Sequence, residues 1–412
     1  MQKSSTAVGL LVILLLLQSC LKDTLTHTYT ILTPVYKSKN EVYADIKSNS
    51  PREINSPGKF FIIGHYIFLN EIDKGIHIID NSDPAKPVKE AFIDIPGNLD
   101  IAVKGNTLYA DLYSDLVVID ISDPLHVKFI KYIPNIFPER NYSNRFVADS
   151  SRVIVDWIKK DTTVNINSPS GQNFYGYLLT PSANFSSNTA APAIPGISGS
   201  TSRFNIINDY LFAVNTYSLT AFDISATNDP QKLSSNNVGW SIETIYSFKD
   251  KLFLGSSSGV FIYDVSNPSS PVNLGQFSHA RSCDPVIVDG DIAYVTLHDG
   301  TPCGGYSNEM DVINVSTLSS PFLVRTYSMT NPHGLTKDNS QLFVCDGKGG
   351  LREYDASDPD HVILKETISG IETFDAIAWN KNLVVVAKDG LYQYDYTTPG
   401  KLIQKSKLAV NP

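Results

Sequence analysis

The chain has 412 residues and a formal charge of −9, and 42% of its residues are hydrophobic. This length and composition exclude a disordered chain and leave room for several small domains or one long repeat array. The mildly acidic balance argues against nucleic acid or an anionic membrane surface as the main partner, so we predict no nucleic-acid partner.

The first twenty residues, MQKSSTAVGLLVILLLLQSC, have the layout of an export leader. One lysine precedes an apolar run from Val8 to Leu17, which is shorter than the ~20 residues that a membrane-spanning helix requires. The run ends in Leu-Gln-Ser-Cys, which resembles a bacterial lipobox. We therefore predict a signal peptide over residues 1–19 and lipidation of Cys20. An ordinary signal peptide followed by a chance cysteine is the alternative.

Residues 20–56 follow the leader and are rich in Thr, Ser, Lys and Asn. We predict that they form the lipidated N-terminus and a tether. Several acyl chains on Cys20 would give stable anchoring, because a single chain binds a membrane only weakly.

A short pattern recurs along the rest of the chain, in which an apolar run ends at Asp and a turn containing Pro follows. LVVIDISDP (116–124) has close copies, for example IHIIDNSDP (76–84), VFIYDVSNP (260–268) and LREYDASDP (351–359). A second apolar strand precedes each copy, and its first residue recurs at intervals of about 40–45 residues in most units. Eight such residues mark eight units: Ile67, Leu108, Val153, Leu211, Leu252, Ile292, Leu342 and Leu383.

Each unit contains four short apolar runs separated by turn residues, as in IAVKG, TLYAD, LVVID and VKFIKYI. Four strands in about 40 residues are typical of a propeller blade. We predict an all-β fold, a β-propeller of four-stranded blades over residues 57–412. Eight blades are favoured, but the third unit, around Val153 and Asn165, is degenerate, so seven blades stay an alternative. The Ser/Ala/Pro-rich stretch at about 180–200 is predicted to be an exposed loop.

The aspartate that ends each copy of the pattern is interpreted as a turn residue. Its side chain can accept hydrogen bonds from backbone N–H groups of the turn, and the following proline suits the chain reversal. Asn takes its place at Asn165 and Asn314, which a turn role tolerates and a general base does not.

These residues resemble the LVIVD-repeat proteins. From about residue 34 to 412 the chain looks like a group of Gram-negative envelope lipoproteins that carry this repeat, in stretches such as GIHIIDNSDP, DIAVKGNTLYAD, FSHARSCDPVIVDGDIAYVTL and MTNPHGL. The resemblance implies a β-propeller at the outer membrane, facing the periplasm or the cell surface. It implies no assigned activity.

One set of positions is ionisable in every unit. In a propeller the first strand of each blade lines the central channel, and the position eight or nine residues before each marker lies at the channel mouth. The residues at this position are Lys59, Asp100, Arg145, Arg203, Glu243, Asp284, His333 and Asp375. A ring of mixed charge that balances itself is one interpretation.

The other interpretation of these positions is a ligand site at the channel mouth. We predict that its acidic side comes from consecutive blades and its basic side from two arginines, and that a calcium or magnesium ion is a candidate cofactor at the carboxylates. The predicted site residues are Arg145, Arg203, Glu243, Asp284, His333 and Asp375.

Three cysteines remain after Cys20. Cys283 lies at the mouth of the sixth unit and Cys303 in its long second-to-third loop, on the same face. In an oxidising compartment we predict a disulfide between them. Cys345 lies within a strand and is predicted to be a buried, inert thiol.

Two functions from different classes follow. The first is a non-enzymatic binding scaffold that is attached to the membrane through its lipid and recognises a ligand, a protein or a glycan. The second is a glycan-directed hydrolase or lyase that uses the acidic residues of the channel mouth. Whether those side chains converge in a concave pocket or pair off in salt bridges discriminates between them.

Overall fold

The computed structural model describes residues 26–138, 151–165, 202–278, 285–299 and 307–411. They form seven four-stranded antiparallel sheets, each built from four strands consecutive in the chain. Within the described residues, no helix is long and apolar enough to cross a membrane.

The seven sheets are the blades of a propeller and are numbered here in chain order. The first three contain β2 (Pro57–Ile63), β3 (Tyr66–Glu71), β4 (Gly75–Asp80) and β5 (Val88–Asp94); β6 (Ile101–Lys104), β7 (Thr107–Leu112), β8 (Asp115–Asp120) and β9 (Lys128–Ile133); and β11 (Phe204–Ile207), β12 (Tyr210–Val214), β13 (Ser218–Asp223) and β14 (Gln231–Asn237).

The fourth and fifth blades contain β15 (Ile242–Phe248), β16 (Lys251–Ser256), β17 (Gly259–Asp264) and β18 (Val272–Ser278), then β19 (Val286–Asp289), β20 (Ile292–Leu297), β21 (Glu309–Asn314) and β22 (Phe322–Ser328). The sixth and seventh contain β23 (Leu335–Asp338), β24 (Gln341–Cys345), β25 (Leu351–Asp355) and β26 (Ile363–Ile368), then β27 (Thr373–Trp379), β28 (Asn382–Ala387), β29 (Gly390–Thr398) and β30 (Lys401–Ala409). A short 3₁₀ turn, η1 (Pro124–His126), follows β8.

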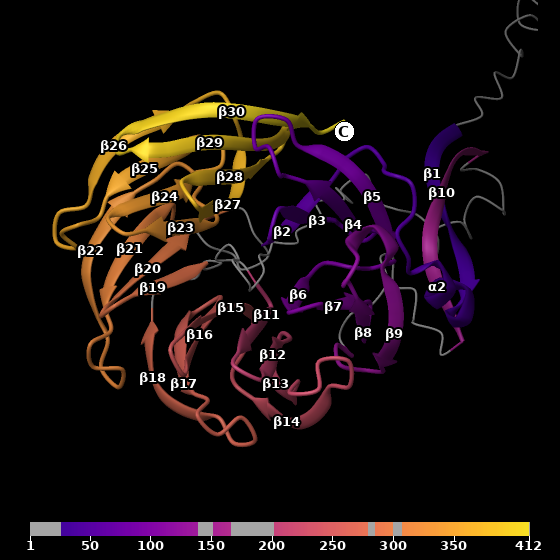
Figure 1. The fold of residues 1–412 in the computed structure, drawn as a ribbon, viewed down its shortest axis with the longest axis horizontal. Coiled ribbons are helices and arrows are strands. Elements are labelled where there is room, and N and C mark those ends of the chain that lie inside the picture. Colours follow the sequence, from indigo (N-terminus) through magenta and orange to yellow (C-terminus); the bar gives the residue numbers. More distant parts are fainter. Residues whose placement is uncertain (1–25, 139–150, 166–201, 279–284, 300–306, 412) are drawn as a thin grey trace, which may run out of the picture. The chain divides into compact units, whose positions relative to one another are not determined.

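The ring closes where the last blade meets the first (Figure 1). Ile54, just before β2, forms a parallel bridge with Val410, just after β30. The side chain of Gln393 donates to Asn81 Oδ1 at 2.6 Å across the same junction. Closure protects the flanks of the two terminal blades and leaves the first strand of each blade nearest the centre, as the sequence predicts.

The blade strands are buried on both faces because each sheet packs against two neighbours. All six residues of β7 are buried, and β8 is buried up to Asp120. The outer strand β9 alternates between exposed and half-buried residues. This difference explains why the repeat contains continuous apolar runs, whereas strands with one solvated face alternate.

The prediction of a β-propeller is confirmed, and the count of blades is the seven-blade alternative. The third unit forms no blade among the described residues. Its marker Val153 lies in one long strand, β10 (Arg152–Asn165), which pairs with β1 (Thr26–Ser38) in a two-stranded sheet. Val153 and Ile154 are buried, but exposed charged residues follow from Asp156 onward. A strand with so many charged side chains cannot be buried between two blades.

Part of the segment predicted as a tether is ordered. After β1 the helix α2 (Lys39–Asp45) begins with a capping box, in which Ser38 and Glu41 bond each other's backbone N–H groups. Val42 and Ile46 are buried in the core that also contains residues of the first blade. The predicted signal peptide and the predicted loop at 180–200 lie outside the described residues.

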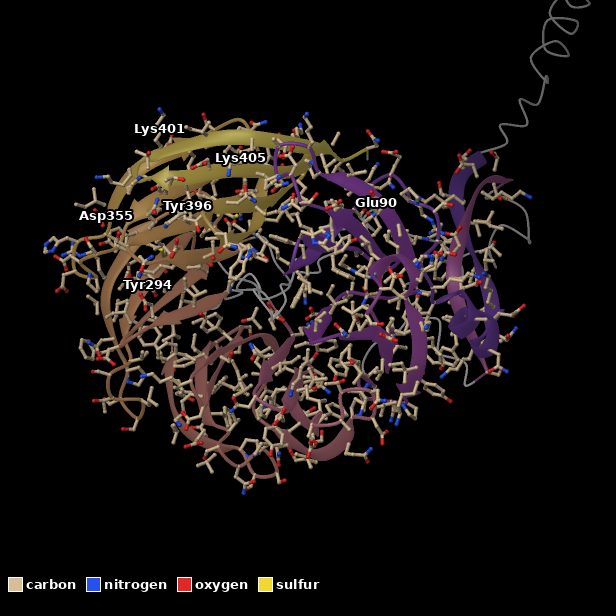
Figure 2. The ribbon with its side chains drawn as sticks, in the orientation of Figure 1. Glu90, Tyr294, Asp355, Tyr396, Lys401 and Lys405 are labelled. Atoms are coloured by element: carbon tan, nitrogen blue, oxygen red, sulfur yellow. The ribbon has the colours of Figure 1, made fainter. Side chains whose placement is uncertain are left out.

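The turn role of the repeated aspartate is confirmed in all seven blades. In the second blade, Asp120 Oδ1 accepts the N–H of Ser122 at 2.8 Å, and in the fifth blade Asn314 accepts the N–H of Ser316 at 3.0 Å. Figure 2 shows Asp355, the equivalent residue of the sixth blade, towards the rim of the ring. The same bond forms at Asp80, Asp223, Asp264, Asp355 and Asp395.

Candidate functional site: the two ends of the central channel

The described ring positions lie at the starts of the innermost strands, as predicted. Lys59 and Asp100, from the first two blades, form a buried ion pair with Nζ and Oδ2 2.6 Å apart. Burial lowers the pKa of Lys59 and raises the pKa of Asp100, and the attraction between them opposes both shifts. The backbone N–H of Arg203 also donates to Asp100 Oδ2, at 2.6 Å. Both interactions of Asp100 Oδ2 are therefore made within the protein.

Glu243 and Arg203 form the next part of the ring. Burial raises the pKa of Glu243 to about 7, while the positive charge of Arg203 acts in the opposite direction. At neutral pH this carboxyl group is therefore close to half-protonated.

His333 belongs to a separate group. Its Nε2 lies 3.0 Å from Asn331 Oδ1, and its ring centroid lies 4.4 Å from that of His298. Burial and the neighbouring His298 lower the pKa of His333 to about 3, so the ring is neutral at physiological pH.

Asp375 is buried in the seventh blade. Its Oδ1 accepts the backbone N–H of Ala376 at 3.0 Å. The same oxygen lies against Gly334, where an added Cβ would approach it to 2.0 Å. Asp375 is therefore tightly packed at this end of the channel.

Several predicted residues lie outside the described part of the chain: Arg145 and Asp284 of the ring, the lipidation residue Cys20, and both cysteines of the predicted disulfide, Cys283 and Cys303. The disulfide and the complete ring stay predictions. Within the described ranges, no group of three or more His, Cys, Asp or Glu could hold a metal ion. Cys345 is a free, buried thiol, as predicted, and burial raises its pKa.

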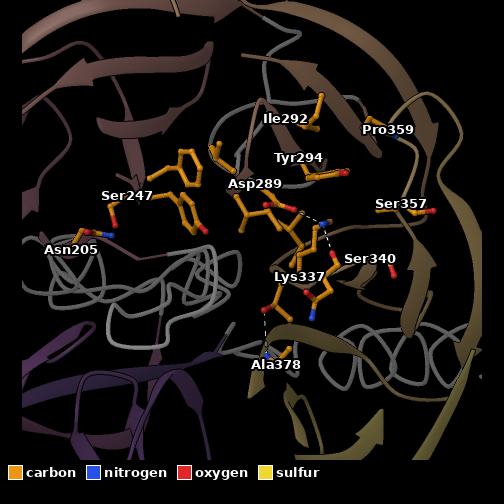
Figure 3. Close-up of a pocket in the computed structure, with 18 of the residues that line it drawn as sticks. Asn205, Ser247, Asp289, Ile292, Tyr294, Lys337, Ser340, Ser357, Pro359 and Ala378 are labelled. Carbon is orange, nitrogen blue, oxygen red and sulfur yellow. Dashed lines mark hydrogen bonds and ion pairs between the residues drawn. The ribbon is translucent and has the colours of Figure 1, made fainter. Parts of the chain in front are cut away.

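The opposite end of the channel contains a cavity of about 810 Å³ that the sequence analysis did not identify (Figure 3). Its wall comes from the ends of five innermost strands, β11, β15, β19, β23 and β27, with residues of β20 and of the turns after β23 and β25. A volume of this size is typical of small-molecule sites.

Two equivalent positions on the innermost strands supply much of this wall. The first pairs with a second-strand residue that is aromatic in six blades, such as Phe68, Tyr109 and Phe212. Around the ring it is occupied by Phe61, Ala102, Asn205, Tyr246, Ile287, Thr336 and Ile377, and the next position by Ile62, Val103, Ile206, Ser247, Val288, Lys337 and Ala378.

Polar residues at these positions are confined to the third, fourth and sixth blades. Asn205 is only 3% exposed, and its Oδ1 has no hydrogen-bond partner. Thr336 Oγ1 accepts the N–H of Ala378 at 3.4 Å. Lys337 Nζ pairs with Asp289 Oδ2 at 2.5 Å and also donates to the backbone oxygen of Asn339. A register that elsewhere supplies apolar core therefore supplies polar groups where the cavity lies.

The sequence contained a signal for this site. The ring at the channel mouth occupies the positions eight or nine residues before the markers. The positions five and six residues before the markers include Asn205, Ser247, Thr336 and Lys337 among apolar residues. Their chemistry is more informative than the ionisable ring, because polar side chains at core positions require a specific partner.

Comparison with protein families supports the repeat. The LVIVD repeat model matches residues 60–91, 98–131, 253–278 and 280–329. The chain carries LVIVD repeats. No curated protein matches the sequence of this LVIVD-repeat propeller.

Three solved structures share the fold at low identity. A periplasmic gluconolactonase of Pseudomonas aeruginosa has a TM-score of 0.53 at 13% identity, over 93% of this chain and 97% of that one. BamB from Moraxella catarrhalis has a TM-score of 0.50 at 8% identity, over 87% and 97%. The computationally designed Ika8 protein has a TM-score of 0.53 at 10% identity, over 88% and 92%. At these identities the likeness shows the fold alone.

Proposed function

We propose that this LVIVD-repeat propeller is a non-enzymatic binding protein of the Gram-negative envelope that holds a small ligand in the cavity at the end of its channel. The main support for this proposal is the cavity, which has a volume of about 810 Å³ and is lined in part by polar residues at positions that are apolar in other blades. Asn205 is polar and buried at such a position, and a buried polar group is costly unless it has a partner.

The proposal includes a lipid anchor at Cys20 in the outer membrane, with the propeller facing the periplasm or the cell surface. It rests on the leader and the lipobox-like Leu-Gln-Ser-Cys at residues 17–20. A rigid ring on a lipid anchor would present the ligand, or a bound protein or glycan partner, close to the membrane.

One observation favours the glycan-directed enzyme as a second candidate. The pKa of Glu243, about 7, is that of a carboxyl group able to serve as a general acid. Glycoside hydrolysis normally needs a second carboxylate across the scissile bond. Asp100, the acidic ring residue of the second blade, already pairs with Lys59 and accepts the N–H of Arg203. It is therefore a poor candidate for this second carboxylate.

The binding proposal is tested by filling the cavity. Ser247, on the cavity wall, is changed to Trp, and the matched control is Ser258→Trp, an exposed residue at the other end of the same blade. The mature protein is incubated with a low-molecular-weight extract of Gram-negative envelopes, repurified and denatured, and the released compounds are identified by mass spectrometry. Wild type and Ser258→Trp should enrich a compound that Ser247→Trp does not.

Equal enrichment by both variants, or none by the wild type, would overturn the proposal. A compound that is converted to a product during the incubation would favour the enzyme, and Glu243→Gln should then stop the conversion.

The anchor is tested separately in cells. Cys20→Ala should leave an uncleaved precursor or release the protein, and labelling by a palmitate analogue should disappear. Unchanged labelling of this variant would refute lipidation at Cys20.

A further inference from the structure

We infer that the cavity ligand is a neutral saccharide, recognised by an aromatic wall on one side and by a charge-balanced polar wall on the other. This inference rests on the proposed binding function and specifies the class of its ligand.

The aromatic wall comes mainly from the fourth blade, and Tyr294 of the fifth blade also lines the cavity. Tyr246 and Phe248 both line the cavity and lie two residues apart on β15, so they share one face of the strand. Both are only partly buried. The negative face of an aromatic ring attracts the C–H groups on the apolar face of a sugar ring.

The polar wall carries no net charge. Among the lining residues the acid is Asp289 and the base is Lys337, and they pair with each other at 2.5 Å. Figure 3 shows this pair beside Ser340. An ionic ligand would have to compete with the existing pair, whereas a hydroxyl group can accept from the ammonium and donate to the carboxylate at once. A polyhydroxylated neutral molecule therefore fits this wall better than an acid or an amine.

Asn205 lies at the third blade's side of the cavity and is the lining residue that most restricts the chemistry of the ligand. Its Oδ1 is an acceptor without a partner and is itself buried from solvent, and the residue as a whole is 3% exposed. An unsatisfied buried amide oxygen costs roughly 1–3 kcal/mol. Rotation of the amide toward the cavity would let a ligand hydroxyl group donate to Oδ1 and would remove that cost. Phe61, Ala102, Ile287 and Ile377 occupy the equivalent position in other blades, so packing alone does not require an amide there.

The hydroxyl groups of serine and threonine complete the wall. Ser247, Thr336, Ser340 and Ser357 all line the cavity. Each can donate as well as accept, which matches the mixed donor and acceptor pattern of a sugar. A purely apolar ligand would offer no partner to these hydroxyl groups and would leave Asn205 Oδ1 unpaired.

Isothermal titration calorimetry on the mature protein tests the ligand class. The saccharide probes are N-acetylglucosamine, cellobiose and maltose, and the comparison probes are uridine, succinate and alanyl-alanine. At least one saccharide should bind, and Asn205→Leu should weaken its binding at least about tenfold. Asn205→Leu should melt at the wild-type temperature or above it, because it removes an unsatisfied buried group.

Asn382→Leu is the matched control. Asn382 is also a buried asparagine whose Oδ1 has no partner, but it does not line the cavity. This variant should retain the wild-type affinity for the saccharide. Ser247→Trp, which fills the cavity, should abolish binding and serves as the second variant if Asn205→Leu folds poorly.

Binding of uridine, succinate or the dipeptide in place of every saccharide would overturn the saccharide inference and leave the binding function standing. Failure of all six probes would also overturn the inference, whereas the binding function depends on the enrichment experiment. Wild-type affinity in Asn205→Leu would mean that the amide does not contact the sugar, which would contradict the role inferred for Asn205.

Discussion

The two ends of the central channel use polar residues in opposite ways. At the mouth, Lys59 and Asp100 neutralise each other in a buried pair, and His333 is held neutral by its surroundings. At the other end, Asn205 has an unpaired buried acceptor and lines a cavity of about 810 Å³. Ionisable residues that recur at one position of the repeat can therefore pair within the protein and serve only its structure. Polar residues at positions that are usually apolar are the better indication of a ligand site.

The largest effect should come from breaking the ion pair at the mouth. Lys59→Met leaves the Asp100 carboxylate buried without its ammonium partner, which should lower the free energy of unfolding by about 3–5 kcal/mol. The double variant with Asp100→Asn should recover most of this loss, because the neutral amide can still accept from the N–H of Arg203. Urea unfolding of both variants is the measurement. If the double variant is as unstable as Lys59→Met, the loss of stability does not come from the unpaired carboxylate of Asp100.

Glu243 should make the mouth sensitive to pH. Its folded-state pKa of about 7 lies above the unfolded value of 4.5, so the folded protein binds the extra proton between these values. Stability relative to Glu243→Gln should be highest below pH ~4.5 and should fall by up to roughly 3 kcal/mol as pH rises to about 7, with little further change. Unfolding curves of both proteins across this range are the test. Parallel pH profiles would contradict the assigned burial of Glu243.

Tight packing at the mouth should make it intolerant of a single methyl group. An alanine Cβ at Gly334 would lie 2.0 Å from Asp375 Oδ1 and 3.0 Å from Asp375 Cα, so Gly334→Ala should cost about 1–3 kcal/mol. At the cavity end Ser247→Ala should change stability by less than about 0.5 kcal/mol. Denaturant midpoints of the two variants give the comparison, and similar values would show that the two ends do not differ in packing.

The smallest effects concern the turns after the third strands, which recur in every blade. Asp120→Leu should cost about 1–2 kcal/mol, because the N–H of Ser122 loses its acceptor. Asp120→Asn keeps an acceptor oxygen and should be close to neutral. Thermal unfolding measures both. A loss of ligand binding in Asp120→Asn at an unchanged melting temperature would assign this residue a functional role.

The repeat could be predicted from the sequence because burial on both faces of each blade produces continuous apolar runs, and because every reversal after the third strand uses the same side-chain bond. The third unit was misleading because Val153 matches the marker position, while the exposed charges from Asp156 onward show that the strand is not sandwiched between blades.

The candidate site was harder to predict than the fold. The placement of Lys59 and Asp100 at one channel end followed from strand counting, but their mutual pairing depends on side-chain geometry between blades. The cavity exists because side chains such as those of Asn205, Tyr246 and Lys337 leave space between the blades unfilled. The spacing of residues along the sequence does not show how side chains pack.

The central claim is that ligand binds at the cavity end and not at the mouth. The most direct measurement is a crystal structure of the mature protein with the compound that the wild type enriches from envelope extract. We expect ligand density between Asn205, Tyr246 and Lys337, with the Lys59–Asp100 pair unchanged. Density beside Arg203 and Glu243, with the cavity free of ligand, would contradict it.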